Sequence, residues 1–245
     1  QSELITQLER EGEMRRAKCD ATAVTALRKK GLVEIIEREI KPYAGDIDIA
    51  ALPTLSKRQG EVLSEITQHF DSVQTVLLRG VTGSGKTEIY THPIAQTLAR
   101  GEDVLLLVPE ISLTTQLVER MQQMFGQRVI CYHSKLTATR RTQIYMDMLR
   151  APAGNFIIGA RSALFLPYKR LGLVVVDEEH DSSYKQSEPN PRYHGRDAAV
   201  MLASLYGANT ILGSATPSLE SFNNAMAAKY CGVSLTTRYG GSLAP

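Results

Sequence analysis

The chain has 245 residues, of which 43% are hydrophobic and 22% charged, as in ordinary soluble globular proteins. Its net charge of only +2 excludes a polycation, so any nucleic-acid-binding surface must be local. No apolar run approaches the roughly 20 residues of a membrane helix, and no signal-peptide layout opens the chain, so we expect no membrane association. Cys19, Cys131 and Cys231 lie too far apart for a zinc or disulfide framework. We therefore expect a cytoplasmic protein with no zinc site in this chain.

The first 41 residues differ in character from the rest. Residues 21–30 have the pattern of a helix with a basic end, stopped by Gly31, and residues 32–40 have the pattern of a strand or hairpin. Helix, glycine and β-ribbon in this order predict a winged-helix-like domain over residues 1–41, truncated at its N-terminus. A small helical packing unit without a DNA role is an equally good interpretation.

Residues 42–53 have the composition of a linker, because proline and glycine interrupt any periodicity. Ser56 then offers a helix N-cap. The apolar face of the helix that follows consists of Val62, Leu63, Ile66 and Phe70. This helix opens a larger domain, which we place at residues 54–245.

A phosphate-binding loop comes next. The apolar run Val76–Leu78 leads into GVTGSGKT, which matches the G-x-x-x-x-G-K-[S/T] pattern and precedes a helix-like segment. Its glycines let backbone N–H groups turn toward an anion, and the start of the helix adds its positive dipole end. Lys86 is expected to reach the β- and γ-phosphates, and Thr87 to bind Mg²⁺. The expected ATP-binding residues of the loop are Gly80, Thr82, Gly83, Ser84, Gly85, Lys86 and Thr87.

Beyond this loop, apolar runs alternate with helical patterns. The predicted strands are 104–108, 129–132, 156–159, 173–176 and 209–212, and the predicted helices are 88–100, 112–125, 138–149, 197–206 and 219–228. Such alternation predicts an α/β fold, a parallel sheet covered by helices on both faces, of the P-loop NTPase (RecA-like) type. Ligands then bind at the carboxyl ends of the strands.

The clearest apolar run, Leu173–Val176, ends in Asp-Glu-Glu-His. Asp177 would hold Mg²⁺ through water, and Glu178 would position or deprotonate the attacking water. The second carboxylate beside a P-loop points to hydrolysis rather than group transfer. His180 follows at once, and we expect it to link the nucleotide to a second ligand.

Three further strand ends offer polar loops. They are Leu107–Leu113, Gly159–Phe165 with Arg161 and Ser162, and Gly213–Ser218 with Ser214 and Thr216. Backbone N–H, hydroxyl and guanidinium donors along one edge of a sheet suit phosphate contacts to a nucleic-acid strand.

A long loop over residues 181–196 begins directly after the acidic residues and has no apolar periodicity. Its basic and aromatic residues are of the kinds that stack on bases and hold phosphates. We expect it to bind DNA and to couple that binding to hydrolysis. The residues concerned are Tyr184, Lys185, Arg192, Tyr193 and Arg196.

These motifs together resemble superfamily 2 helicases, and more closely the PriA family of bacterial replication-restart helicases. The resemblance covers about residues 54–245, with 1–41 in the position of the family's winged helix. The segments that carry it are GVTGSGKTEIY, LLLVPEISLTTQ, YHSKLT, GARSALFLP, VVVDEEHDSSYKQ, PRYHGRD and GSATPSLES.

The resemblance implies ATP-driven 3′-to-5′ unwinding of single-stranded and forked DNA at stalled forks, with primosome proteins and single-stranded DNA-binding protein as partners. It also implies that Gln59 reads the adenine. The family's domain for the 3′ end of the nascent strand, its zinc-binding cysteines and its second lobe with an arginine finger have no counterpart in these residues. We therefore expect a winged helix plus a first helicase lobe that alone binds ATP weakly and hydrolyses little of it.

Two other functions remain open from the sequence. One is a P-loop ATPase that translocates on duplex DNA without separating its strands. The other is a non-enzymatic, nucleotide-gated scaffold that binds DNA or protein.

Overall fold

The computed structural model describes residues 4–6, 19–34, 52–72 and 74–236. The chain forms two compact units, residues 1–41 and residues 42–245, each of which is described by itself. No helix within the described residues combines the length and the apolar composition needed to cross a bilayer.

In the first unit, helix α2 spans Ala21–Lys29. The Asp20 carboxylate caps it by accepting hydrogen bonds from the N–H groups of Thr22 at 2.7 Å and Ala23 at 3.1 Å. Gly31, with φ 69°, follows the helix end, so the predicted helix and its glycine stop are confirmed. The predicted strand or hairpin at 32–40 and the linker at 42–53 lie mostly outside the described residues.

The second unit is built on a seven-stranded sheet with the order β3-β4-β2-β5-β6-β1-β7, and every described pairing is parallel. The predicted α/β class is confirmed. The strands are β1 (Thr75–Gly80), β2 (Asp103–Leu107), β3 (Val129–Tyr132), β4 (Phe156–Gly159), β5 (Leu171–Val176), β6 (Asn209–Ser214) and β7 (Cys231–Leu235).

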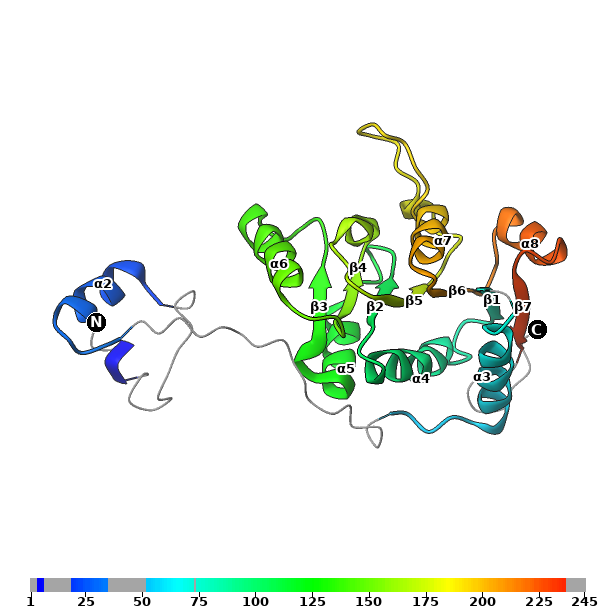
Figure 1. Ribbon diagram of the computed structural model, residues 1–245, viewed down its shortest axis with the longest axis horizontal. Coiled ribbons are helices and arrows are strands. Elements are labelled where there is room, and N and C mark those ends of the chain that lie inside the picture. Colours follow the sequence, from blue (N-terminus) through cyan, green and yellow to red (C-terminus); the bar gives the residue numbers. More distant parts are fainter. Residues whose placement is uncertain (1–3, 7–18, 35–51, 73, 237–245) are drawn as a thin grey trace. The chain divides into compact units, whose positions relative to one another are not determined.

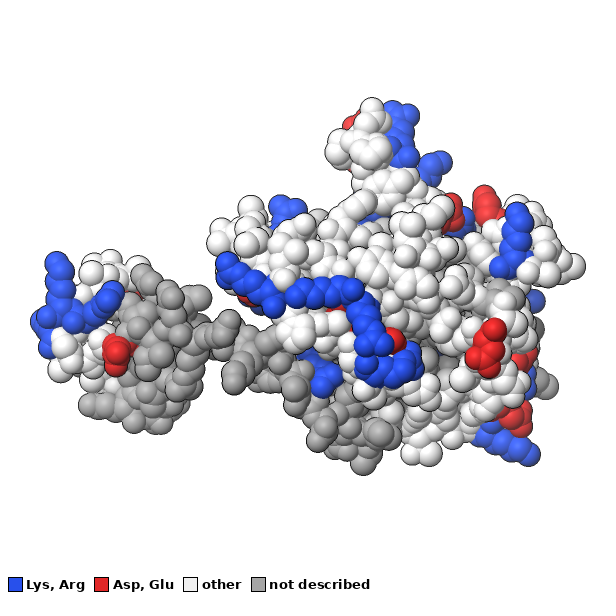
Figure 2. Space-filling model, in the orientation of Figure 1, with Lys and Arg blue, Asp and Glu red and all other residues white. Residues whose placement is uncertain are grey.

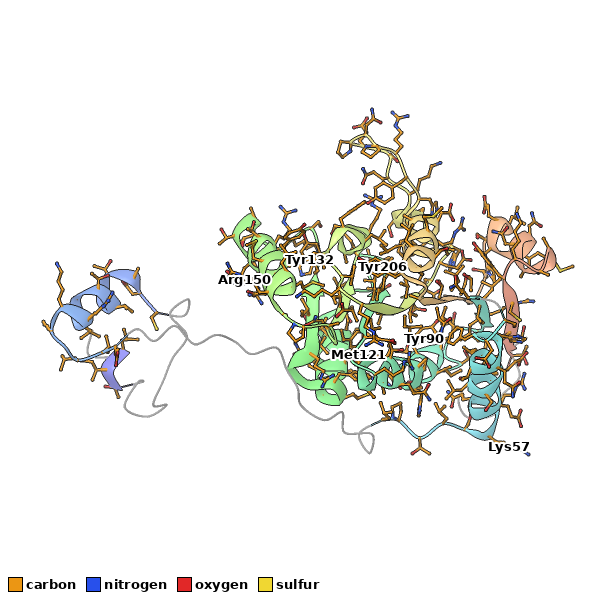
Figure 3. The ribbon with its side chains drawn as sticks, in the orientation of Figure 1. Lys57, Tyr90, Met121, Tyr132, Arg150 and Tyr206 are labelled. Carbon is orange, nitrogen blue, oxygen red and sulfur yellow. The ribbon has the colours of Figure 1, made fainter. Side chains whose placement is uncertain are left out.

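Helices cover both faces of this sheet (Figure 1). One face carries α3 (Lys57–His69), α4 (Lys86–Ala99) and α5 (Thr115–Phe125), and the other carries α6 (Ala138–Arg150), α7 (Gly195–Tyr206) and α8 (Leu219–Met226). Alternate strand residues enter two separate hydrophobic clusters, which is why the strands read as continuous apolar runs. Tyr90 of α4 and Met121 of α5 belong to the same cluster, below the sheet in Figure 3.

Two elements differ from the prediction. Strand β7 was not predicted, because its five residues alternate between partly exposed and buried positions, as befits an edge strand beside β1. The long loop at 181–196 contains a short 3₁₀ helix, η5 (Ser182–Tyr184), and a backbone bridge between Lys185 and His194. This loop stands out from the domain as a protrusion before α7 (Figure 1).

The strand order positions the site. Strand β6 lies between β1, which leads into the P-loop, and β5, which leads into the acidic segment. Because the strands are parallel, their three carboxyl ends meet at one edge of the sheet. Asp177 N–H donates to the Leu107 carbonyl at 2.9 Å and Glu179 N–H to the Gly213 carbonyl at 3.0 Å, so the turn after β5 is fixed to the ends of β2 and β6.

Candidate active site

The P-loop has the backbone that an anion site requires. Gly83 and Gly85 have φ of 76° and 82°, which L-residues with side chains rarely adopt, and Gly85 is the N-cap of α4. A Cβ atom on Gly80 would lie 2.9 Å from Ser84 Oγ and from the Lys86 side chain. The loop thus leaves no room for a side chain at Gly80 or Gly85, and at Gly83 the backbone angle alone favours glycine.

A pocket of ≈ 590 Å³ opens at this loop. Its lining residues are Pro53, Thr54, Val81, Thr82, Gly83, Ser84, Gly85, Lys86, Thr87, Glu88, Arg120, Asp177 and Glu178. Ser84 Oγ is buried there without a hydrogen-bond partner among the described residues. A positive helix end, a lysine, an unpaired hydroxyl and two carboxylates fit a nucleoside triphosphate with Mg²⁺.

Lys86 is the buried cation of this pocket. Its Nζ donates to the Gly80 carbonyl at 2.9 Å and lies 3.5 Å from Glu178 Oε1. The ammonium is therefore held between the start of the P-loop and the acidic turn. Both partners are oxygens that phosphate oxygens can replace.

Asp177 is held by two tyrosines. Tyr90 Oη donates to its carboxylate at 3.1 Å, and Tyr184 Oη donates to its backbone carbonyl at 2.7 Å. Burial, followed by the negative charge of Glu178, raises the pKa of Asp177 to about 6, against the opposing effects of Lys86 and the Tyr90 hydroxyl. Burial also raises the pKa of Tyr90 well above its ordinary value, so this hydroxyl stays a donor. A cation bound here would remove the cost of charging Asp177.

A chain of polar contacts leads from Glu178 to the loop after β6. Glu178 has φ 47°, an uncommon conformation for a residue other than glycine. Its Oε2 lies 3.7 Å from His180 Nδ1, which is 2.7 Å from Ser214 Oγ. That hydroxyl accepts from the Thr216 N–H at 3.0 Å. The structure thus brings His180, Ser214 and Thr216 together, and their expected contacts with DNA stay a prediction.

Glu179 faces the protein interior instead. It is fully buried, and its Oε2 pairs with Arg196 Nη1 at 3.1 Å. Ser218 donates to it from both N–H (2.7 Å) and Oγ (3.0 Å), and Ser221 Oγ donates at 2.8 Å. The carboxylate therefore joins β5 to α7 and to the start of α8. We call these four side chains the Glu179 cluster.

Burial corrects two of the predicted DNA contacts. Arg196 is 5% exposed and Tyr184 1%. Burial alone would lower the pKa of Arg196, but its ion pairs with Asp197 and Glu179 raise it. These side chains contact other residues of the same domain and present no surface to a DNA strand. Their composition matched a DNA-binding loop, whereas their position makes them internal connections between that loop and the acidic turn.

The other predicted DNA contacts lie at or near the protrusion. Lys185 and Arg192 are exposed, and Figure 2 shows basic side chains on the protrusion at the top of the view. At its base the Arg161 guanidinium lies 5.6 Å from the centroid of the Tyr193 ring. Phe165, which the sequence did not single out, packs edge-on against Tyr193 and is 65% exposed.

Ser162 differs from these neighbours. Its hydroxyl is buried and has no partner among the described residues. A nucleic-acid phosphate could not reach this hydroxyl in the observed conformation.

Gln59 lies beside the P-loop rather than in the pocket lining. Its Nε2 donates to the carbonyls of Ser84 at 3.2 Å and Gly85 at 3.4 Å, and its Oε1 accepts from the Ser56 N–H at 2.8 Å. Both ends of the amide are thereby occupied, in a side chain only 1% exposed. The predicted reading of adenine would require the amide to leave these partners, and it stays a prediction.

Sequence reasoning missed three contributors to the site. Tyr90 follows Lys86 by four residues and so lies on the same side of α4, a signal that was available. Ser218 is the N-cap of α8, which the pattern before that helix could have shown. Arg120 left no signal, because nothing in α5 indicates that it reaches Glu88, at 2.7 Å, across from α4.

The site and fold define a class of protein. The family model described as DEAD/DEAH box helicase matches residues 56–225, which is most of the chain. The chain belongs to the DEAD/DEAH box helicase family.

Within this family, proteins named replication restart protein PriA are similar to the chain, and the resemblance predicted from the motifs is confirmed. PriA of Chlamydia trachomatis serovar D is 44% identical over 222 residues, which cover 89% of this chain and 29% of that protein. PriA of Haemophilus influenzae is 42% identical over 228 residues, which cover 90% of this chain and 31% of that protein. The chain thus spans less than a third of the length of these relatives.

A solved structure supports the fold alone. RecG bound to a three-way DNA junction superposes with a TM-score of 0.55 at 22% identity, over 80% of this chain and 25% of that one.

Proposed function

We propose that this chain is the ATP-binding lobe of a DNA helicase that acts in replication restart. The observation that carries the proposal is the contact between Lys86 and Glu178 inside the P-loop pocket, 3.5 Å from Nζ to Oε1. It joins the phosphate-binding lysine to the candidate base for hydrolysis. The similarity to PriA proteins supports the choice of DNA as the polymer on which the hydrolysis acts.

The chain's own residues would hold ATP and Mg²⁺ as follows. The N–H groups of the P-loop and Lys86 bind the β- and γ-phosphates, and Thr87 and Asp177 hold the metal side of the pocket. Magnesium, when bound, neutralises charge on the phosphates. Glu178 Oε1 orients the attacking water and accepts its proton.

Hydrolysis would be coupled to DNA through two routes that begin at the acidic turn. One runs from Glu178 through His180 to Ser214 and Thr216. The other runs from Asp177 to Tyr184, which belongs to the 3₁₀ helix at the start of the protrusion. From this helix it continues to the exposed basic and aromatic side chains of the protrusion. Backbone and stacking contacts of this kind bind single strands without reading sequence.

The finer parts of the proposal come from the PriA family. They are 3′-to-5′ direction, preference for forked DNA, assembly with primosome proteins and single-stranded DNA-binding protein, and a cytoplasmic location. A second lobe would supply the arginine finger, which accounts for roughly 10³–10⁵ in rate in other P-loop enzymes. Zinc would belong to the longer protein and not to these residues. Without the second lobe and its arginine finger, this chain alone would bind ATP weakly and hydrolyse little of it.

The test is ATP hydrolysis and strand separation by the full-length protein on forked, single-stranded and duplex DNA, wild type against Lys86→Ala. We expect hydrolysis that forks and single strands stimulate and that Lys86→Ala abolishes. Equal stimulation by uninterrupted duplex, without strand separation, would show a duplex translocase instead. Fork binding with no hydrolysis in the wild type would show a scaffold.

A further inference from the structure

The edge of the sheet opposite the P-loop carries a second group of basic residues. Because the strands are parallel, their amino ends lie together at this edge, away from the nucleotide pocket. Five cations lie in the segments that lead into β2, β3, β4 and β5, and Figure 2 shows basic side chains that gather across the front of the domain, between α6 and α4 of Figure 1. We call these five residues the amino-edge patch: Arg100, Arg128, Arg150, Lys169 and Arg170.

The patch follows the order of the strands. β3, β4, β2 and β5 are neighbours in the sheet. The first residues of these strands pair in register, Val129 and Val104 with Phe156, and Asp103 with Leu171. Strands about 4.8 Å apart place the two ends of such a row about 15 Å from each other. The cations therefore form a row along the edge and do not surround a single point.

One buried carboxylate fixes two loops of this edge. Asp103 is 1% exposed and accepts hydrogen bonds from the N–H groups of Gly154 and Asn155, each at 2.9 Å. It also accepts from the N–H groups of Lys169 at 3.1 Å and Arg170 at 3.3 Å. The backbone of both basic residues is thereby held in place while their side chains are exposed.

A second carboxylate, Glu102, joins two of the cations. Its Oε2 lies 2.9 Å from Arg100 Nη2, and its Oε1 lies 3.3 Å from Arg170 Nη2, so one negative charge holds two guanidiniums beside each other. The Arg170 side chain nevertheless remains 65% exposed. Among the described residues, no acid lies within ion-pair distance of Lys169 or Arg150. The patch therefore keeps an excess of positive charge at the surface.

The charge and the spacing of the patch fit the backbone of a nucleic-acid duplex. A duplex carries one negative charge about every 1.7 Å along its axis. Its major groove is about 12 Å wide, so cations at the two ends of a row of about 15 Å can reach phosphates of both strands. Guanidinium and ammonium groups bind phosphates without reading the bases. The aromatic pair Phe165 and Tyr193, of the kind that stacks on the bases of a single strand, lies instead at the base of the protrusion.

We propose that the amino-edge patch binds the phosphate backbone of double-stranded DNA, as a second DNA surface separate from the protrusion and from the strand-end loops. The assignment goes beyond the proposed function, which concerns hydrolysis and single strands at the opposite edge of the sheet. In a protein that acts on forked DNA, the occupant would be a duplex arm of the fork.

The experiment measures binding of a fluorescent duplex of about 20 base pairs and of a thymidine strand of about 20 nucleotides to the chain, by anisotropy at several salt concentrations. The double variant Lys169→Ala/Arg170→Ala should weaken duplex binding at least about tenfold at about 0.1 M salt. The slope of log K against log salt concentration should become shallower by about 2, because each lost phosphate contact contributes about 0.9. Binding of the single strand should stay within about twofold of wild type.

Two matched double variants remove the same charge elsewhere. Lys57→Ala/Lys229→Ala, at exposed positions on α3 and after α8, should leave duplex binding within about twofold of wild type. Lys185→Ala/Arg192→Ala, on the protrusion, should weaken binding of the single strand and not that of the duplex.

The outcomes separate this proposal from the proposed function. Unchanged duplex affinity or salt slope in Lys169→Ala/Arg170→Ala would overturn the amino-edge patch as a DNA surface, as would a wild-type chain that does not bind the duplex. Equal losses for duplex and single strand, or an equal loss in Lys57→Ala/Lys229→Ala, would show an effect of net charge alone and would overturn it too.

Unchanged single-strand binding in the protrusion variant would count against the proposed coupling route and would leave the patch standing. The substitutions in the patch should not unfold the chain, because the contacts of Asp103 with residues 169 and 170 are made by backbone N–H groups, which alanine keeps.

Discussion

The turn after β5 contains two neighbouring glutamates with opposite surroundings. Glu178 faces the P-loop pocket, is partly exposed and lies 3.5 Å from Lys86 Nζ. Glu179, the next residue, is fully buried and is paired with Arg196 and hydrogen-bonded by two serines. One carboxylate is thus available for chemistry, while the other connects three elements of the fold. The acidic turn thus has one side that faces the nucleotide pocket, the proposed reactive side, and one side that connects elements of the fold.

The two sides should also differ in their effect on stability. A carboxylate whose pKa is raised, as at Asp177, costs free energy in the folded chain whenever it is ionised. A buried carboxylate with a guanidinium and three hydrogen-bond donors stabilises the fold relative to losing any one partner. Removing residues from the reactive side should therefore stabilise the chain or leave it unchanged, and removing them from the Glu179 cluster should destabilise it.

The largest expected effect is that of Glu179→Ala. It should lower the free energy of unfolding by about 3–5 kcal/mol, because it removes the buried carboxylate that pairs with the Arg196 guanidinium and accepts from two serine hydroxyls. Urea denaturation of the chain measures this. Glu178→Ala is the matched control and should change stability by no more than about 0.5 kcal/mol. Similar losses in both variants would remove the distinction between the two glutamates.

The next effect has the opposite sign. Asp177→Asn should raise the free energy of unfolding at pH 7.5, without Mg²⁺, by on the order of 3 kcal/mol, because the pKa of Asp177 is about 6 in the folded chain against an ordinary 3.8. The raised pKa favours the protonated carboxyl in the folded state, so wild-type stability falls as the pH rises from about 4 to about 6.

The asparagine variant lacks this dependence, and the two stabilities should meet near pH 4. Urea denaturation at pH 4, 5, 6 and 7.5 measures the difference. Glu110→Gln, at an exposed position, serves as the control for removal of a negative charge. A gain in stability that is the same at every pH would mean that titration of Asp177 is not its cause.

Ser218→Ala should cost about 1–2 kcal/mol. Its Oγ both donates to Glu179 and accepts from the Ser221 N–H as the N-cap of α8. Thermal or urea unfolding measures the loss, with Thr216→Ala, an exposed residue two positions earlier, as control. An unchanged free energy of unfolding would show that the Ser218 hydroxyl does not contribute to the stability of the Glu179 cluster.

The smallest effect concerns the hydroxyl of Tyr90. Tyr90→Phe removes the hydrogen bond that lowers the pKa of Asp177, so this pKa should rise above about 6. The rise corresponds to a change on the order of 1 kcal/mol in the free energy of protonating the carboxylate. Titration of the carboxyl carbon resonance in Mg²⁺-free buffer measures it. A pKa that falls or stays constant would contradict the assigned role of this hydroxyl.

Much of this architecture could be predicted from the sequence. Strands β3 and β4 begin and end where their apolar runs do, and the P-loop and the acidic turn follow buried strands as their motifs require. The parallel arrangement follows from the alternation of strands and helices. Strand β7 could not be predicted, because Cys231–Leu235 is short and only half buried.

The side-chain environments were harder to predict. Arg196 lies among basic and aromatic residues whose composition indicates a nucleic-acid contact. Its position in the first turn of α7, however, places its guanidinium against the buried Glu179. Composition does not say whether a cation faces solvent or a buried carboxylate. The contact of Arg120 with Glu88 joins α5 to α4 through two residues that are 32 positions apart in the sequence, so it depends on tertiary packing alone.

The most direct test of the account is steady-state ATP hydrolysis by the full-length Glu178→Gln protein with forked DNA, at an ATP concentration shown by direct titration to saturate both it and the wild type. If Glu178 handles the proton of the attacking water, as we propose, hydrolysis should fall at least about hundredfold while ATP affinity is retained. Hydrolysis within a few-fold of wild type would contradict the assignment of Glu178 as the reactive glutamate.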